Sequence, residues 1–287
     1  MTITLNFDNP PVMPKLLLRA ALTRKAKSLK PTAKDVPTIA ANLSRLQIDP
    51  SKLRSYNAVC GFPEDSDILS ATYPHIAAFS LHMEMLLNAQ FPFSPMGIVH
   101  LRNRIEQLRP IQVSETLSLH CTISDSRDTD LGLEVDIATT AKSGTEVVWT
   151  DLTTVLKRAP SRSGKPKRST LETFSEREDW SLAANLGRRY ARVSGDYNPI
   201  HLFPASAKLL GFKRHIAHGM WSKARCLAAL QPKLNVDAFC IDVEFKTPVF
   251  LPTQVGLHYE NSEQGIAFSL RNEAGNRPHV NGSLRAL

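Results

Sequence analysis

Three short blocks of this sequence occur twice, in the same order, on either side of a basic segment. YNAVCGF at 56–62 matches YARVSGD at 190–196 in its tyrosine, valine and glycine. HIAAFSLHM, beginning at His75, resembles HIAHGMWSK, beginning at His215, and RPIQV resembles LPTQV further on. Because the order is shared, duplication accounts for the matches better than chance, and we expect two similar units.

Each half also shows the same order of predicted elements. An apolar helical stretch at 75–87 or 219–230 is followed by runs in which apolar and polar residues alternate. We expect these strands at 116–123, 131–141 and 146–156 in the first half, and at 238–250, 255–260, 266–272 and 279–287 in the second. One long helix followed by antiparallel strands predicts an α+β unit in which the sheet wraps the helix.

The 287 residues are therefore expected to divide into four segments. These are an N-terminal extension at 1–35, a first unit at 36–157, a basic linker at 158–169 and a second unit at 170–287. The linker is rich in Ser, Pro and Gly, which favours a solvated connection. The segment PKLLLRAALTRKAKSLK at 14–30 favours a surface helix that packs its leucines on the body over a basic amphipathic helix at a membrane surface.

Composition narrows the possible partners. The net charge of +8 suits a polyphosphate-bearing small molecule, but no nucleic-acid motif is present and aromatics are not interleaved with the basic residues. No apolar run approaches the roughly 18 residues of a membrane span, so stable membrane insertion is not expected. Four scattered cysteines favour a reduced, cytoplasmic chain.

The stretch SGDYNPIH, which starts at Ser194, has the spacing of a shaped loop. Asp196 and His201 are five residues apart, which does not suit neighbours on a helix, and Gly195 permits a sharp turn before the acid. The loop can aim a carboxylate and an imidazole at one point. The structural alternative is a carboxylate that merely caps a helix starting near Pro204.

A glycine at the start of the second long helix favours the chemical interpretation. Gly219 lies where backbone N–H groups are unpaired and the helix dipole favours negative charge, and it lacks a side chain that would block a ligand oxygen. The first half carries Phe62 in place of Asp196, and Ala78-Phe79 in place of His218-Gly219. We therefore expect chemistry in the second half only.

SGDYNPIH, followed by AHGM at 217–220, resembles the hydratase 2 motif of MaoC-like enoyl-thioester hydratases and dehydratases. The resemblance is strong over about 190–230 and does not cover residues 1 to about 35. It implies a double hotdog, in which a degenerate first hotdog helps to accommodate the acyl chain. It also implies a role in fatty acid metabolism.

The resemblance implies a role for each matching residue. Asp196 and His201 correspond to the dyad that activates water, and the backbone N–H of Gly219 corresponds to the donor that polarises the thioester carbonyl. Ser194, Asn198 and His218 are expected to support them. The implied reaction is hydration of a trans-2-enoyl thioester to the (R)-3-hydroxyacyl product, and its reverse, without a metal or organic cofactor. Phe203 departs from the family, which usually has an acid there, and this puts loop packing or substrate preference in doubt.

Other interpretations remain open. His201, His215 and His218 raise the alternative of a metal site, since His215 and His218 have a plausible ligand spacing, but Gly219 follows directly and no HExxH motif or cysteine ligand joins them. A hotdog thioesterase and a non-catalytic acyl-thioester binding protein are the alternative functions. The carrier is either coenzyme A or an acyl carrier protein, and the chain is either a monomer or a homodimer. Phosphates could be contacted by basic residues outside the motif: Arg102, Arg104, Lys165, Lys167 and Arg168.

Overall fold

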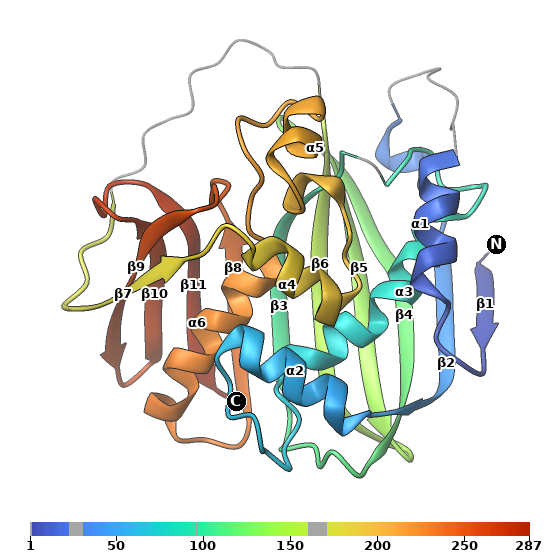
Figure 1. The fold of residues 1–287 in the computed structure, drawn as a ribbon. Helices are drawn as coiled ribbons and strands as arrows, with labels where there is room; N and C mark the ends of the chain where they lie inside the picture. Colours follow the sequence, from blue (N-terminus) through green and yellow to red (C-terminus); the bar gives the residue numbers. More distant parts are fainter. Residues whose placement is uncertain (1, 23–30, 96, 160–170) are drawn as a thin grey trace. The chain divides into compact units, whose positions relative to one another are not determined.

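A computed structural model describes residues 2–22, 31–95, 97–159 and 171–287 (Figure 1). The chain forms two compact units that are not contiguous in sequence. Unit 1 comprises Met1–Ile48, Pro74–Ile105 and Ser114–Arg168, and unit 2 comprises Asp49–Tyr73, Glu106–Val113 and Ser169–Leu287. Two segments of the first half therefore fold with the second half, and the tandem boundaries expected from the sequence stay a prediction.

Unit 1 is a helix against a sheet whose strands run in the order β1-β2-β4-β5-β6-β3. Its helix is α3 (Tyr73–Leu87), within two residues of the predicted span. The pairs from β2 to β6 are antiparallel, while β1 adds to β2 in parallel. The strands are β1 (Ile3–Phe7), β2 (Ile39–Gln47), β3 (Val99–Gln107), β4 (Thr116–Thr129), β5 (Gly132–Ser143) and β6 (Glu146–Arg158).

The N-terminal extension is part of unit 1. Helix α1 (Met13–Leu22) buries Leu16 and Ala20 against Met83 and Leu87 of α3. A short 3-10 helix, η1 (Ala33–Asp35), follows before β2. The predicted surface helix is thus confirmed for 13–22, although Leu16 is buried while Leu18 and Leu22 are exposed. Residues 23–30 of the predicted helix lie outside the described residues. No helix in the described part of the chain is long and apolar enough to cross a membrane.

A buried polar group links α3 to the sheet of unit 1. His75 Nδ1 lies 2.9 Å from Asp151 Oδ2 on β6, and the Asn103 side-chain amide donates to the same oxygen at 2.8 Å. Thr153 donates to the other carboxylate oxygen at 2.8 Å. Burial alone would raise the pKa of Asp151, but the neighbouring His75 and the hydrogen bonds from His75 and Asn103 hold it well below its usual range.

Unit 2 has the sheet order β8-β11-β10-β9-β7, with every pair antiparallel. Helix α6 (Gly219–Leu234) packs on β8, β10 and β11, and begins at the predicted glycine. The strands are β7 (Glu176–Leu182), β8 (Phe239–Phe245), β9 (Thr253–Ser262), β10 (Gly265–Asn272) and β11 (Pro278–Ala286). The remaining helices are α2 (Pro50–Cys60), α4 (Leu186–Ser194), the 3-10 helix η2 (Pro199–His201) and α5 (Pro204–Leu209) (Figure 1).

The first repeated block is confirmed as a structural repeat. Helices α2 and α4 pack together in unit 2, and each ends at a left-handed glycine, Gly61 with φ 83° and Gly195 with φ 77°. The N–H of each glycine donates to the carbonyl four residues earlier. Phe62 therefore occupies the position after the Gly61 turn that Asp196 occupies after the Gly195 turn.

The predicted alignment of the second repeated block, which pairs His75 with His215, is wrong. His75 lies inside α3, two residues after its start, whereas His215 precedes the first residue of α6 by four positions. Ala78-Phe79 consequently lies in the middle of a helix and is not the counterpart of His218-Gly219. Sequence identity at a few apolar positions aligned these segments without regard to where each helix begins.

Candidate active site

The turn after α4 places the acid. Gly195 ends the helix in the left-handed region, and the Asp196 N–H then donates to Ser194 Oγ at 3.2 Å. The Asn198 N–H donates to Asp196 Oδ1 at 3.1 Å. The carboxylate is fixed by its own loop, yet the Asp196 side chain keeps 30% of its surface exposed and can meet a solute.

Asn198 then starts the 3-10 turn that carries the histidine. Its side-chain oxygen accepts from the Ile200 N–H at 3.4 Å, and Pro199 occupies the first position of η2. His201 is the last residue of η2. Helix α5 does begin at Pro204, but no side chain caps it, so the alternative in which Asp196 merely caps this helix is wrong.

The tautomer of His201 follows from its hydrogen bond. His201 is buried, and its Nδ1 lies 2.8 Å from the carbonyl oxygen of Ile216. Because a carbonyl only accepts, Nδ1 carries the proton, and Nε2 of the neutral ring is left as a proton acceptor. The carbonyl of His201 in turn passes against Gly187 of α4, where an added Cβ would lie 2.0 Å from that oxygen.

His218 completes the group. Its Nε2 donates to the backbone carbonyl of Asp196 at 3.0 Å, and its ring stacks on His201 with centroids 3.7 Å apart and planes at 24°. One carboxylate or ring-nitrogen atom from each of Asp196, His201 and His218 lies within 4.8 Å of the other two. The Asp196 carboxylate and the His201 ring are therefore close enough to contact one small molecule, and the ring of His218 packs against that of His201.

Burial controls the protonation of both rings. Desolvation lowers the pKa of His201 below its usual value, and the raising effect of the Asp196 carboxylate only partly offsets it. The general expectation that a neighbouring carboxylate raises an imidazole pKa therefore does not decide the outcome here. Burial and the neighbouring His201 lower the pKa of His218 to about 3, so both rings are neutral near pH 7.

The first turn of α6 supplies backbone donors beside this group. His218 is the N-cap residue, with extended backbone and no side-chain capping bond, and Gly219 is the first helical residue. Among the described residues the Gly219 N–H has no acceptor, as expected for the first turn of a helix. The ring of Phe245 covers Gly219 closely: an added Cβ would meet its Cε1 at 3.0 Å.

Comparison with known proteins shows the family. The model of the MaoC like domain matches residues 168–281. A 3-hydroxyacyl-thioester dehydratase X of Mycobacterium tuberculosis is 35% identical over 277 residues, covering 95% of this chain and 98% of that protein. The chain belongs to the MaoC-like dehydratase family.

Two further comparisons support this membership. The crystal structure of HtdX of Mycobacterium tuberculosis superposes with a TM-score of 0.76 at 33% identity, covering 86% of this chain and all of that one. A peroxisomal enoyl-CoA hydratase 2 of Arabidopsis thaliana is 28% identical over 162 residues, 49% of this chain and 51% of that protein. The predicted MaoC-like resemblance and the hotdog fold are confirmed.

Several expected contacts of this MaoC-like chain lie elsewhere or outside the described residues. His215 donates through Nε2 to the Ala184 carbonyl at 2.7 Å and is not in the group of possible metal ligands. Phe203 is 52% exposed, and the guanidinium of Arg188 lies 4.8 Å from its ring centroid. Arg102 pairs with Glu134 in unit 1. The possible phosphate contacts in the linker, Lys165, Lys167 and Arg168, lie outside the described residues.

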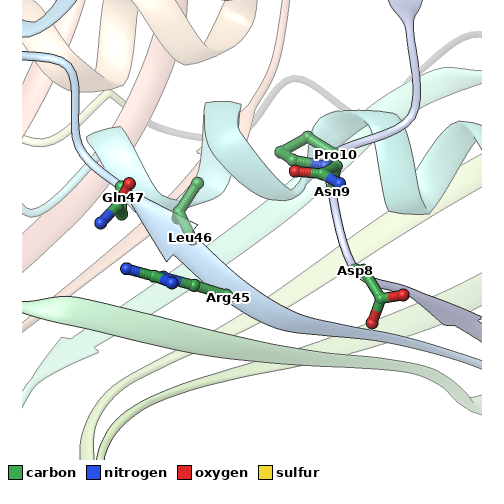
Figure 2. A pocket seen from close by; sticks show the side chains of 6 residues that line it. All are labelled: Asp8, Asn9, Pro10, Arg45, Leu46 and Gln47. Atoms are coloured by element: carbon green, nitrogen blue, oxygen red, sulfur yellow. The ribbon is translucent and has the colours of Figure 1, made fainter.

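Unit 1 contains a pocket that shares no lining residue with the candidate site. Figure 2 shows it between the turn after β1 and the end of β2, with the side chains of Asp8 and Arg45 pointing away from each other. None of the residues expected to act lines it. Its lining residues are Asp8, Asn9, Pro10, Arg45, Leu46 and Gln47.

Sequence reasoning missed two residues of the site. Gly187 gives the His201 carbonyl its room, and Phe245 covers Gly219 from β8. Glycine lowers helix stability, so a glycine inside a predicted helix suggests a close packing contact. At the start of a short helix such as α4 this signal is weak. Nothing near Phe245 in the sequence distinguishes it from other strand residues.

Proposed function

We propose that this chain is a hydro-lyase that adds water to the double bond of 2-enoyl thioesters and removes it from 3-hydroxyacyl thioesters. The observation that carries the proposal is the convergence of the Asp196 carboxylate and the His201 ring within 4.8 Å, beside the free N–H groups that open α6. The names of the relatives, a 3-hydroxyacyl-thioester dehydratase and an enoyl-CoA hydratase, support the same reaction class.

Hydration begins with a water held between Asp196 and His201. The neutral His201 accepts through Nε2, because its Nδ1 proton is engaged by the Ile216 carbonyl. As the water oxygen attacks C3 of the enoyl group, one water proton passes to the dyad and electron density moves to the thioester oxygen. A proton returned by the dyad to C2 completes the addition, so one water is consumed for each double bond lost.

Gly219 supplies the complementary stabilisation. In the proposed pose its N–H donates to the thioester carbonyl, where negative charge develops as the enolate forms. One well-placed donor of this kind is worth about 3–4 kcal/mol in the transition state. Gly219 has no side chain to cover this N–H, and the Phe245 ring is the group nearest to where a Cβ would lie.

Both reacting groups lie on one side of the substrate in this arrangement. Water delivery and proton return by a single dyad give addition to one face of the double bond, and the family resemblance assigns the (R)-3-hydroxyacyl product. The stereochemistry is part of the proposal and is read directly from the chirality of the product.

We further propose that the reaction needs no metal or organic cofactor. Asp196, His201 and His218 are the described group whose donor atoms are close enough to suggest a cation. Histidine, however, binds a metal in the plane of its ring, and the rings of His201 and His218 are stacked face to face at 3.7 Å. Their lone pairs therefore run side by side rather than converging on one ion at the roughly 2.0–2.1 Å that zinc requires.

The alternatives make different demands on the same site. A non-catalytic acyl-thioester binding protein needs no dyad, and a thioesterase would release the carrier as a free thiol. The fixed Asp196 carboxylate and the accepting Nε2 of His201 favour hydration over simple binding.

The test is hydration of crotonyl-CoA, followed by loss of enoyl absorbance, with chiral analysis of the 3-hydroxybutyryl product. Asp196→Asn and His201→Ala are each expected to lower kcat by at least about a hundredfold, because each removes one proton-transfer group. Phe62→Leu, at the equivalent turn, is the matched control and should keep its turnover. Free thiol without 3-hydroxyacyl product would identify a thioesterase, and full activity in Asp196→Asn would exclude the dyad.

A further inference from the structure

The segment between His201 and Ile216 forms a loop whose two ends are hydrogen-bonded near His201. Residues 202–215 are here called the 202–215 loop. The Ile216 N–H donates to the Ile200 carbonyl at 3.1 Å, and the Ile216 carbonyl accepts from His201 Nδ1 at 2.8 Å. The base of the loop is therefore hydrogen-bonded both to the candidate base and to the residue before it.

The first part of the loop is supported by contacts with the preceding turn, η2. Ala207 is fully buried, and Ser206 Oγ donates to the Pro199 carbonyl at 2.7 Å. Helix α5 packs on η2, which carries His201. The exposed side chains of the loop are thus presented on a supported backbone.

Three of the exposed side chains of the loop are large and apolar. Leu209 is 87% exposed, which is the largest exposure among the large hydrophobic residues of the described chain, and Leu210 is 43% exposed. Phe203 adds a third apolar surface at 52%. Single exposed hydrophobics are ordinary, but three within eight residues beside an active-site histidine indicate a contact surface.

The loop itself also carries basic residues. Lys208, Lys213 and Arg214 are exposed and have no carboxylate partner among the described residues. The sequence holds no other acid than Asp196 between positions 180 and 236. Exposed cations and exposed apolar side chains on one loop complement an acidic partner that also carries an apolar patch.

We propose that the 202–215 loop is the docking surface for an acidic carrier protein that holds the acyl group as a thioester. The inference rests on the proposed function, since it names the carrier of that substrate. Coenzyme A would use the cations through its phosphates but has no need of Leu209 and Leu210. A protein uses both, because apolar anchors beside charged groups provide most of the affinity of such an interface.

The test compares two carriers of one acyl group. Hydration of crotonyl-CoA and of crotonyl-charged bacterial acyl carrier protein is measured for the full chain, for Leu209→Ser and for the pair Lys213→Glu and Arg214→Glu. With the carrier protein we expect KM to rise about tenfold or more in each variant while kcat is unchanged. With crotonyl-CoA both constants should stay within twofold of the wild-type values.

Matched controls come from unit 1. Leu131→Ser removes a leucine that is 59% exposed, and Lys142→Glu reverses an exposed lysine, so neither should change KM for either substrate. Thermal unfolding of every variant verifies that the fold is intact.

The other outcomes contradict either the docking proposal or the proposed function, and they are distinguishable. Equal KM increases for both carriers would assign the cations to phosphates shared by the two substrates. Unchanged KM for the carrier protein would remove the loop from recognition, and variant-dependent binding to phosphatidylglycerol vesicles with unchanged carrier kinetics would make the loop a membrane contact. Absence of hydration with both wild-type substrates would instead contradict the proposed function.

Discussion

The backbone contact between Gly187 and His201 gives the sharpest test of how the site is positioned. Gly187 is the second residue of α4, and a Cβ added there would lie 2.0 Å from the carbonyl oxygen of His201 and 3.0 Å from its carbonyl carbon. A carbon and an oxygen that are not bonded need about 3.2 Å, so Gly187→Ala requires a relative shift of about 1 Å. The oxygen belongs to the backbone and the Cβ is bonded directly to the backbone of α4, so neither can rotate away as the end of a long side chain can.

The shift falls on the residue that carries the candidate base. A misplacement of about 1 Å costs on the order of a hundredfold in rate, which corresponds to about 2.7 kcal/mol in the activation free energy. Overpacking also lowers the free energy of unfolding by about 1–3 kcal/mol. We therefore expect Gly187→Ala to be folded but to hydrate crotonyl-CoA about a hundredfold more slowly.

A second glycine separates these two effects. In Gly282→Ala, on β11, the added Cβ would meet the Asp242 carbonyl oxygen and the Phe268 ring at 2.6 Å, and none of these residues belongs to the site. This variant should lose stability in thermal unfolding while keeping kcat within about threefold, since its clash does not move His201. The positioning argument is refuted if Gly187→Ala keeps wild-type kcat, or if the two variants lose kcat equally.

Three further predictions follow from the pKa values and the packing. Because burial lowers the pKa of His201, the acid limb of kcat/KM for crotonyl-CoA should fall below pH 6.5, and a limb above 7 would contradict a buried neutral base. Asp151→Asn should lower the free energy of urea unfolding at pH 7 by about 3–5 kcal/mol, since it leaves His75 without its buried carboxylate. Because the pKa of Asp151 is depressed, its contribution to the free energy of unfolding is complete above about pH 4 and is lost as the pH falls further. The difference between Asp151→Asn and wild type should therefore persist at pH 5, and a difference under about 1 kcal/mol would refute this role of Asp151. Gly219→Ala should slow hydration by displacing Phe245, and Phe245→Leu in the same chain should restore part of kcat; a double variant no faster than the single one would contradict this contact.

Local signals in the sequence predicted the parts of the fold that depend on local patterning. The start of α6 at Gly219 and the strands at 116–123 and 266–272 follow from a helical apolar stretch and from regular alternation. Strand β7 was not predicted, because its sequence EREDWSL is mostly charged and it lies at the edge of the unit 2 sheet. Pairing with β9 defines it as a strand, and that partner is remote in sequence.

The candidate site shows the same division. The loop from Gly195 to His201 was predictable because glycine, asparagine and proline each restrict the backbone at a known position. The lowered pKa of His201 was not predictable, since it depends on how much protein surrounds the ring rather than on the nearby acid. The misaligned second repeat failed for a related reason: short apolar matches carry no information on where a helix begins.

Helix α2 gives the first copy of the repeat a continuing role. The Trp221 indole N–H on α6 donates to the Val59 carbonyl on α2 at 3.0 Å, and Tyr56 packs near Tyr190 with ring centroids 6.2 Å apart. The segment that carries Phe62 after its turn therefore supports both α6 and α4. Residues 170–287 alone would lack α2, so the two halves of the sequence cannot be separated without removing part of unit 2.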